Sequence, residues 1–154
     1  MRTIWILVAD AGRAQILSKM EGTDGLVSVQ HLENATGRAQ DVDLVSDHPG
    51  RIEKHGSGTR STMDPPTDPH EQEAINFARR LNQRLEAAES QGDYDILVLV
   101  APPHFLGLLK SGLGQGPQRR LVSTIPKDLT RLSNPELQVH LADVLEFPYA
   151  DVPG

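Results

Sequence analysis

Several acidic residues of this sequence could support metal-dependent hydrolysis. Asp10 closes the first apolar run of the chain, where a catalytic carboxylate at the end of a strand would stand. Hydrolysis with two metal ions needs several converging carboxylates, which Asp43, Asp47 and Glu73 could supply. The second apolar run, Ile96 to Val100, ends in Ala-Pro-Pro without an acid. We therefore predict that Asp10 caps a turn by accepting hydrogen bonds from backbone amides, and we keep a hydrolase as the alternative.

Positive charge gathers in one glycine-rich segment of an otherwise acidic chain. The formal net charge is −6, from 15 basic and 21 acidic residues, so any contact with nucleic acid needs a local basic patch. The segment offers Arg51, Lys54, His55, Gly56, Gly58 and Arg60. Its glycines let the backbone approach a partner closely, and its cations can clamp phosphate. An ordinary solvated connection is the other interpretation of this segment.

Other candidate motifs lack a residue that their chemistry requires. His70 and Glu71 open an H-E pair, but Ala74 occupies the position four after His70, which breaks the zinc-protease pattern. The glycines between Gly112 and Gly116 have neither a preceding strand nor a following Lys and Ser/Thr, as a nucleotide loop needs. The sequence contains no cysteine, which excludes disulfides and thiolate metal sites and fits a reducing compartment. We expect a cytoplasmic protein with no cofactor.

The spacing of apolar residues predicts a three-stranded meander followed by alternating helices and strands. The meander strands are expected at Thr3 to Ala9, Ala14 to Ser18 and Leu26 to Leu32. The continuous aliphatic run from Ile96 to Val100 predicts a strand buried on both faces. We expect that strand to lie beside the first one and parallel to it, because a helical crossover returns the chain beside its start.

The clearest helix signal begins at Asp68, the predicted N-cap. Pro69 suits the first helical position, and Glu71 could reach back to the N–H of the cap. The helix then carries an apolar stripe formed by Ala74, Ala78, Leu81, Leu85 and Ala88. Later elements are a short helix around Phe105 to Leu109, a strand near Leu121 to Ile125, and a last helix that starts with a Ser133–Glu136 capping box and carries Leu137, Leu141, Val144 and Leu145.

These elements predict an α/β protein with a mixed sheet covered by helices, as in ribonuclease H-like folds. The expected order is β-β-β-α-β-α-β-α within a single domain over residues 1–154. Residues 34–68 are expected to form a long mobile loop, and residues 147–154 a frayed tail. No segment is long enough to span a bilayer, and the run from Ile4 to Ala9 is shorter than the core of a signal peptide, so no membrane contact is expected.

Five motifs, in order along the chain, resemble the bacterial host attachment protein family. They are WILVADAGRA at 5–14, DLVSDHPGR at 43–51, TDPHE at 67–71 leading into Phe77-Ala78, LVLVAPP at 97–103 with Phe105-Leu106-Gly107, and KDLT at 127–130. The family is similar in fold to the middle domain of archaeal and eukaryotic class I release factors and of Pelota. The family name implies a role in attachment of bacteria to host cells. The similarity in fold implies a ribosome or tRNA partner.

The resemblance also bears on catalysis. Release factors carry a catalytic Gly-Gly-Gln loop between the last meander strand and the first long helix, where this sequence has KHGSGTR at 54–60. Gln115, which stands between two glycines, lies elsewhere in the chain, so peptide release is not expected. We therefore predict a non-enzymatic binding module whose partner is a ribosome, a tRNA or a protein. Direct adhesion at the cell surface is disfavoured because no export signal is found. The candidate binding residues are Arg51, Lys54, His55, Gly56, Gly58 and Arg60 of the basic segment, with Asp10, Arg13, Asp68, His70, Lys127 and Asp128 from the other motifs.

Overall fold

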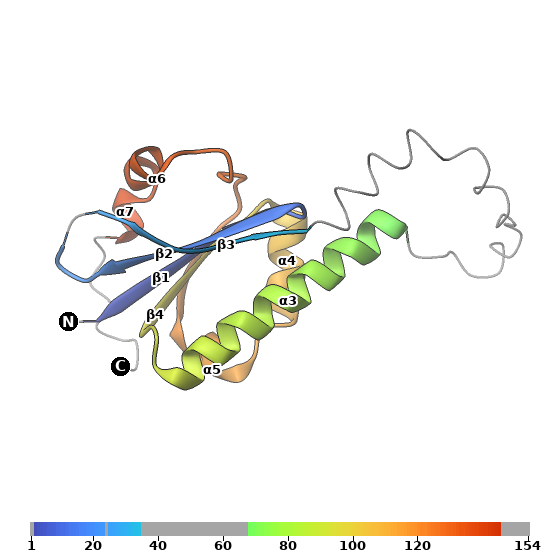
Figure 1. Ribbon diagram of the computed structural model, residues 1–154, viewed down its shortest axis with the longest axis horizontal. Coiled ribbons are helices and arrows are strands. Elements are labelled where there is room, and N and C mark those ends of the chain that lie inside the picture. Colours follow the sequence, from blue (N-terminus) through green and yellow to red (C-terminus); the bar gives the residue numbers. More distant parts are fainter. Residues whose placement is uncertain (1, 24, 35–67, 146–154) are drawn as a thin grey trace, which may run out of the picture.

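A computed structural model describes residues 2–23, 25–34 and 68–145, which form a sheet with helices on both faces (Figure 1). The strands are β1 (Thr3–Ala9), β2 (Arg13–Met20), β3 (Val27–Glu33), β4 (Ile96–Val100) and β5 (Leu121–Ile125). The helices are α3 (Pro69–Gln91), α4 (Pro103–Ser111), α5 (Gln115–Arg120), α6 (Asn134–His140) and α7 (Ala142–Leu145). The loop expected between β3 and α3 and the expected C-terminal tail lie outside the described residues. Within the part of the chain that is described, no helix is long and apolar enough to cross a bilayer.

The sheet is mixed, with the strand order β3-β2-β1-β4-β5. The first three strands form the antiparallel meander that the sequence predicts. β4 pairs with β1 in parallel, with Ile4 opposite Ile96 and Val8 opposite Val100, which confirms the predicted neighbour and direction. β5 then adds in parallel to the other side of β4. The predicted α/β class is confirmed.

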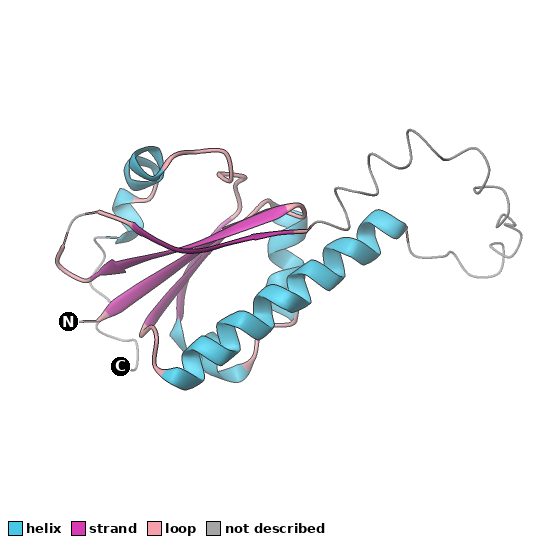
Figure 2. Cartoon of the chain, in the orientation of Figure 1, coloured by secondary structure: helices cyan, strands magenta, loops and turns pink. Residues whose placement is uncertain are grey.

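The sheet separates two hydrophobic layers, with α3 and α4 on one face and α6 and α7 on the other (Figure 2). Successive side chains of a strand point to opposite faces, so Trp5 and Leu7 pack toward α3 whereas Ile4 and Ile6 pack toward α6. Every residue of β4 is buried, as expected for a central strand covered on both sides. The carboxyl ends of β1 and β4 therefore meet in the middle of one sheet edge.

α3 begins as the sequence predicts, but Glu71 has a different role from the one expected. The Asp68 carboxylate accepts a hydrogen bond from the His70 backbone N–H at 3.0 Å, and the whole predicted apolar stripe is buried. The Glu71 carboxylate, expected to reach back to the cap, lies against His104 at 2.8 Å. The reason is that the first turn of α4 comes close to the first turn of α3 and offers a ring nitrogen there.

The helices of the C-terminal half differ in two ways from the expected order. An additional helix, α5, separates α4 from β5. The predicted last helix is instead two short ones, because α6 ends at His140 and its C-cap residue, Leu141, has a φ of −106° that departs from helical geometry. Its Ser133–Glu136 capping box is confirmed. The break keeps Leu141 and Leu145 buried against the sheet.

Candidate functional site

A pocket of about 560 Å³ opens at the edge where β1 and β4 end, and we call it the carboxyl-edge pocket. The β1–β2 turn contributes Asp10, Ala11, Gly12 and Arg13, and the surrounding segments contribute Ala74, Pro102, His104, Phe105 and Arg131. From this edge β1 turns back into β2 while β4 continues into α4. Crevices outside the carboxyl ends of parallel strands, where neighbouring connections diverge, are the usual ligand sites of α/β sheets.

Asp10 caps the turn between β1 and β2, as the sequence predicts. One carboxylate oxygen accepts the backbone N–H of Gly12 at 2.8 Å and that of Arg13 at 2.9 Å. The other oxygen accepts the hydroxyl of Thr130 at 3.0 Å. These bonds fix the direction in which the chain leaves β1, and with it the start of β2 at Arg13.

Thr130 links the two acidic candidates that the sequence could not place together. Its Oγ1 lies 2.7 Å from Asp128 Oδ1 as well as 3.0 Å from Asp10 Oδ2. A hydroxyl has one hydrogen, so this donor is shared between the two carboxylates. The Thr130 backbone N–H also donates to Asp128 at 3.1 Å. The KDLT motif is thereby held at the same sheet edge as the first turn.

Two arginines supply positive charge to the carboxyl-edge pocket. Arg13 is half-buried and Arg131 is exposed, and both line the pocket. Neither guanidinium makes a hydrogen bond or an ion pair with another residue in the described ranges. Sequence reasoning found Arg13 but missed Arg131, because a lone arginine between helices carries no periodic or motif signal.

His104 is a further lining residue that the sequence analysis missed. Its Nε2 lies 2.8 Å and 3.0 Å from the two carboxylate oxygens of Glu71. The pair joins the first turns of α3 and α4 beside the pocket. Because His104 is exposed and Glu71 is only half-buried, the pair contributes at most about 1 kcal/mol to stability.

The remaining predicted residues either lie outside the lining of the pocket or belong to the part of the chain that is not described. Asp68 and His70 lie in the exposed first turn of α3, and Lys127 follows β5 with its N–H donating to Ile125 O. None of these is among the residues that line the pocket, and neither is Asp128. The basic segment lies outside the described residues, and with it the candidates Arg51, Lys54, His55, Gly56, Gly58 and Arg60.

The described chain next to that basic segment is fixed at the same edge. Asn34, the last described residue before the segment, donates its amide to Ala11 O at 3.0 Å and to Glu73 O at 3.4 Å. Ala11 lines the pocket, and Glu73 precedes the lining residue Ala74. The chain therefore leaves the described region beside the carboxyl-edge pocket and returns at the cap of α3, Asp68.

The metal-binding alternative gains no support from the residues that can be placed. Within 2–23, 25–34 and 68–145, no three His, Asp or Glu side chains gather as a metal ion would require. Asp43 and Asp47, on which the hydrolase hypothesis depends, lie outside these ranges. Asp10 Oδ1 accepts two backbone N–H groups and Oδ2 accepts the Thr130 hydroxyl, so most of its acceptor positions already serve the protein.

One family model, described as "Protein required for attachment to host cells", matches residues 5–141. No curated protein matches the sequence. Among solved structures, the archaeal translation termination factor aRF1 is similar with a TM-score of 0.47 and 11% identity, over 94% of this chain and 39% of that one. A Ppx/GppA phosphatase of Aquifex aeolicus follows with a TM-score of 0.39 and 9% identity, over 81% and 35% of the two chains. The chain thus spans well under half of either structure, and neither likeness bears on activity.

Proposed function

Since the chain belongs to the family of proteins required for attachment to host cells, we propose that it is a binding module that holds an anionic group of a partner in the carboxyl-edge pocket. The observation that carries this proposal is the pair of guanidinium groups, Arg13 and Arg131, which line the pocket without a partner in the described chain. Guanidinium groups bind phosphate and carboxylate through paired hydrogen bonds. In a chain of net charge −6, such unneutralised cations mark a local site for an anion.

The chemistry of Asp10 favours binding over hydrolysis. A general base must accept a proton from its substrate, whereas three of about four acceptor positions of the Asp10 carboxylate already accept hydrogen bonds from the protein. Asp10 instead helps to position Arg13, because it accepts the backbone N–H of that residue and so fixes the turn between β1 and β2. The hydrolase remains the alternative, and it requires Asp43 or Asp47 to approach this edge.

RNA of a ribosome or tRNA is the partner that we propose. Phosphate is the anion that RNA offers at every nucleotide, and phosphate contacts position a protein without reading sequence. Arg51, Lys54 and Arg60 would add to the same electrostatic attraction, because their segment leaves the described chain beside the pocket, at Asn34. An effect on attachment to host cells would then follow indirectly from this contact.

The test is a double substitution, Arg13→Gln with Arg131→Gln, in the full chain. We expect weaker binding to tRNA or to pelleted ribosomes. We also expect the slope of log K against log salt concentration to be shallower by about 1 to 2, because binding releases fewer counterions when phosphate contacts are lost. Fluorescence anisotropy over a salt series measures both quantities. The matched control, Lys110→Gln with Arg119→Gln, removes the same charge from α4 and α5 outside the pocket.

Equal binding by the pocket variant and the control would show that the pocket does not hold the anion. Failure of the parent protein to bind any RNA or ribosome would remove the proposed partner. Cleavage of RNA by the parent protein in the presence of Mg²⁺ or Mn²⁺ would favour the hydrolase, provided that the Asp10→Asn variant no longer cleaves RNA.

A further inference from the structure

A second hollow adjoins the carboxyl-edge pocket at Arg13, the residue that lines both, and we call it the β3 hollow. Its volume is about 150 Å³, and its wall includes Gln15 of β2, His31 and Glu33 of β3, and Thr130. A cavity of about this volume can hold a single six-membered ring. A ligand bound at Arg13 can therefore place a ring-sized group in the β3 hollow.

The antiparallel pairing of β2 with β3 puts the polar side chains of this hollow on one face of the sheet. Arg13 lies opposite Glu33, and Gln15 lies opposite His31. Directly opposite side chains of an antiparallel pair share a face. This face is the one covered by α6, because Gln15 Nε2 lies 3.4 Å from Oδ1 of Asn134, the first residue of α6. The same face thus carries the guanidinium of the pocket and three polar groups beside it.

Gln15 offers an acceptor that a ligand can reach. Its Nε2 donates to Ser28 Oγ at 3.0 Å and to Asn134 Oδ1 at 3.4 Å. Both bonds use the amide nitrogen, and Gln15 Oε1 accepts no hydrogen bond from a described residue. The side chain is half-buried and lines the hollow. Gln15 can therefore accept a hydrogen bond from a donor held there.

The charge of the lining changes sign from the pocket to the hollow. Arg13 and Arg131 are the guanidinium groups of the pocket, whereas the hollow adds the carboxylate of Glu33. Like charges repel, so this carboxylate disfavours a second phosphate in the hollow. The hollow thus suits an uncharged group of ring size that donates a hydrogen bond and lies next to the bound phosphate.

We infer that the β3 hollow holds the ribose of a nucleotide whose phosphate is bound by Arg13 and Arg131, and that Gln15 Oε1 accepts the 2′-hydroxyl of this ribose. The ribose is an uncharged ring joined to the phosphate through an ester bond, so it reaches the hollow when the phosphate lies at Arg13. DNA lacks the 2′-hydroxyl, so the contact distinguishes RNA from DNA. This inference rests on the proposed phosphate contact and adds a chemical reason for RNA as the partner.

Three short oligouridylates that differ only at the 2′ position test the contact. The ribose form carries the donor, the deoxyribose form lacks it, and the 2′-fluoro form lacks it but keeps a ribose-like sugar pucker. Fluorescence anisotropy with the full chain should show the ribose form bound about fivefold or more tighter than either of the others, as one hydrogen bond allows. Titration with the ribose form should also shift the backbone amide resonances of Gln15 and His31.

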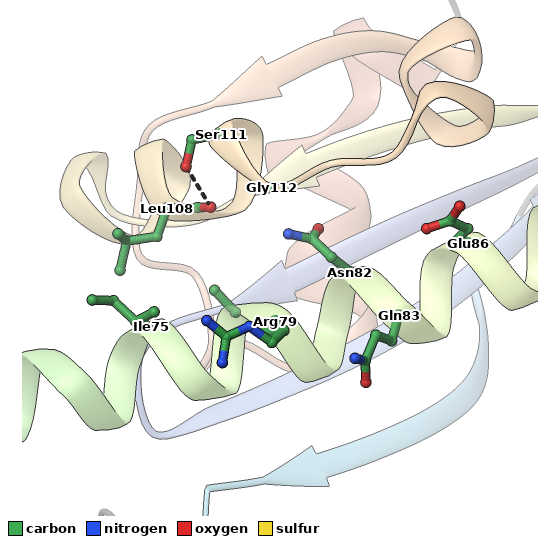
Figure 3. A pocket seen from close by; sticks show the side chains of 9 residues that line it. Ile75, Arg79, Asn82, Gln83, Glu86, Leu108, Ser111 and Gly112 are labelled. Atoms are coloured by element: carbon green, nitrogen blue, oxygen red, sulfur yellow. Dashed lines mark hydrogen bonds between the residues drawn. The ribbon is translucent and has the colours of Figure 1, made fainter.

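Two variants separate the roles of the acceptor and the carboxylate. Gln15→Leu should bind all three oligomers as the parent binds the deoxyribose form, because it loses the acceptor and keeps both arginines. Glu33→Gln should bind all three more tightly and still prefer the ribose form, because it loses only the repulsion of phosphate. The matched controls are Gln83→Leu and Glu86→Gln in a separate hollow between α3 and α4, which shares no lining residue with the pocket or the β3 hollow (Figure 3). Both controls should bind as the parent does.

Equal binding of the ribose and 2′-fluoro forms by the parent would overturn the ribose contact, and so would an undiminished preference for ribose in Gln15→Leu. The proposed phosphate contact would survive either result if Arg13→Gln with Arg131→Gln still weakened the binding of all three oligomers. Failure of the parent to bind any of the three would remove both the phosphate contact and the ribose contact.

Discussion

Asp10 illustrates what a single residue type in a known sequence setting does and does not predict. Its turn-capping role follows from Asp-Ala-Gly-Arg at the end of an apolar run, because aspartate readily accepts bonds from the amides two and three positions on. Its contact with Thr130 joins positions 120 residues apart, and no local pattern could indicate it. Arg131 and His104 were missed for the same reason, because the fold alone brings them to Arg13.

Tyr94 offers a test of burial at the same scale. Its ring is 1% exposed and its hydroxyl donates to Leu85 O at 2.8 Å. Burial raises the pKa of the phenol well above its ordinary value, and the nearby Glu89 carboxylate raises that pKa further. Because the pKa is raised in the folded state, the contribution of Tyr94 to stability is complete below the pKa of tyrosine in the unfolded chain, about 10. This contribution is lost as the pH rises above that pKa toward the higher pKa of the folded state.

In a Tyr149→Phe protein, which leaves Tyr94 as the remaining tyrosine, the ultraviolet absorbance should therefore show no phenolate until the pH passes about 10 by a wide margin or the chain unfolds. Circular dichroism recorded in parallel identifies unfolding. A reversible titration near the ordinary value in a folded protein would contradict the burial of this ring.

At the scale of the elements, prediction succeeded where local signals were strong. The bounds of β1 and β5 agree with the predicted ranges, and α3 begins at its Asp68 cap. α5 was missed because Gly116 and Pro117 have low helix propensity. A Cβ on Gly116 would lie 2.2 Å from Glu89 Oε1, so the end of the Glu89 side chain would have to move if this glycine were replaced.

The N-cap of α3 provides the prediction for this scale. Asp68→Ala removes the acceptor of the His70 N–H and should lower the free energy of unfolding by about 1 kcal/mol. Asp68→Asn is the matched control, because asparagine caps helices about as well as aspartate. Urea denaturation measures both. If the alanine and asparagine variants were equally stable, the cap would not contribute and the start of α3 would be held by packing alone.

For the whole molecule, composition predicted that any contact with nucleic acid needs a local basic patch, but it did not predict where that patch lies. Net acidity pointed to a confined basic site, and the sequence put that site between Asp47 and Asp68. The described residues add a cationic pocket at the sheet edge from which that segment departs. Its location could not be predicted because it depends on the parallel pairing of β1 with β4 and on the position of the 127–131 segment beside them.

The basic segment is tested by Arg51→Ala, Lys54→Ala and Arg60→Ala together. We expect the triple variant to keep the parental melting temperature and to capture less RNA or ribosome from lysate, because phosphate contacts add to affinity roughly one by one. The control removes three cations elsewhere, through Arg79→Ala, Lys110→Ala and Arg119→Ala. Undiminished capture by the first variant would make the segment a connector and leave the pocket as the site.

The central place of β1 in the sheet has a consequence for the order in which the molecule can form. β1 is made first, yet half of its pairing waits for β4, whose Ile96 joins Ile4 across most of the chain length. Contacts of such separation are slow to form. Until β4 arrives, the meander presents the unpaired edge of its most apolar strand, a template for pairing with other chains. A fragment that ends before β4 should therefore aggregate and not fold, because α3 packs on a face of the sheet and leaves this edge of β1 open.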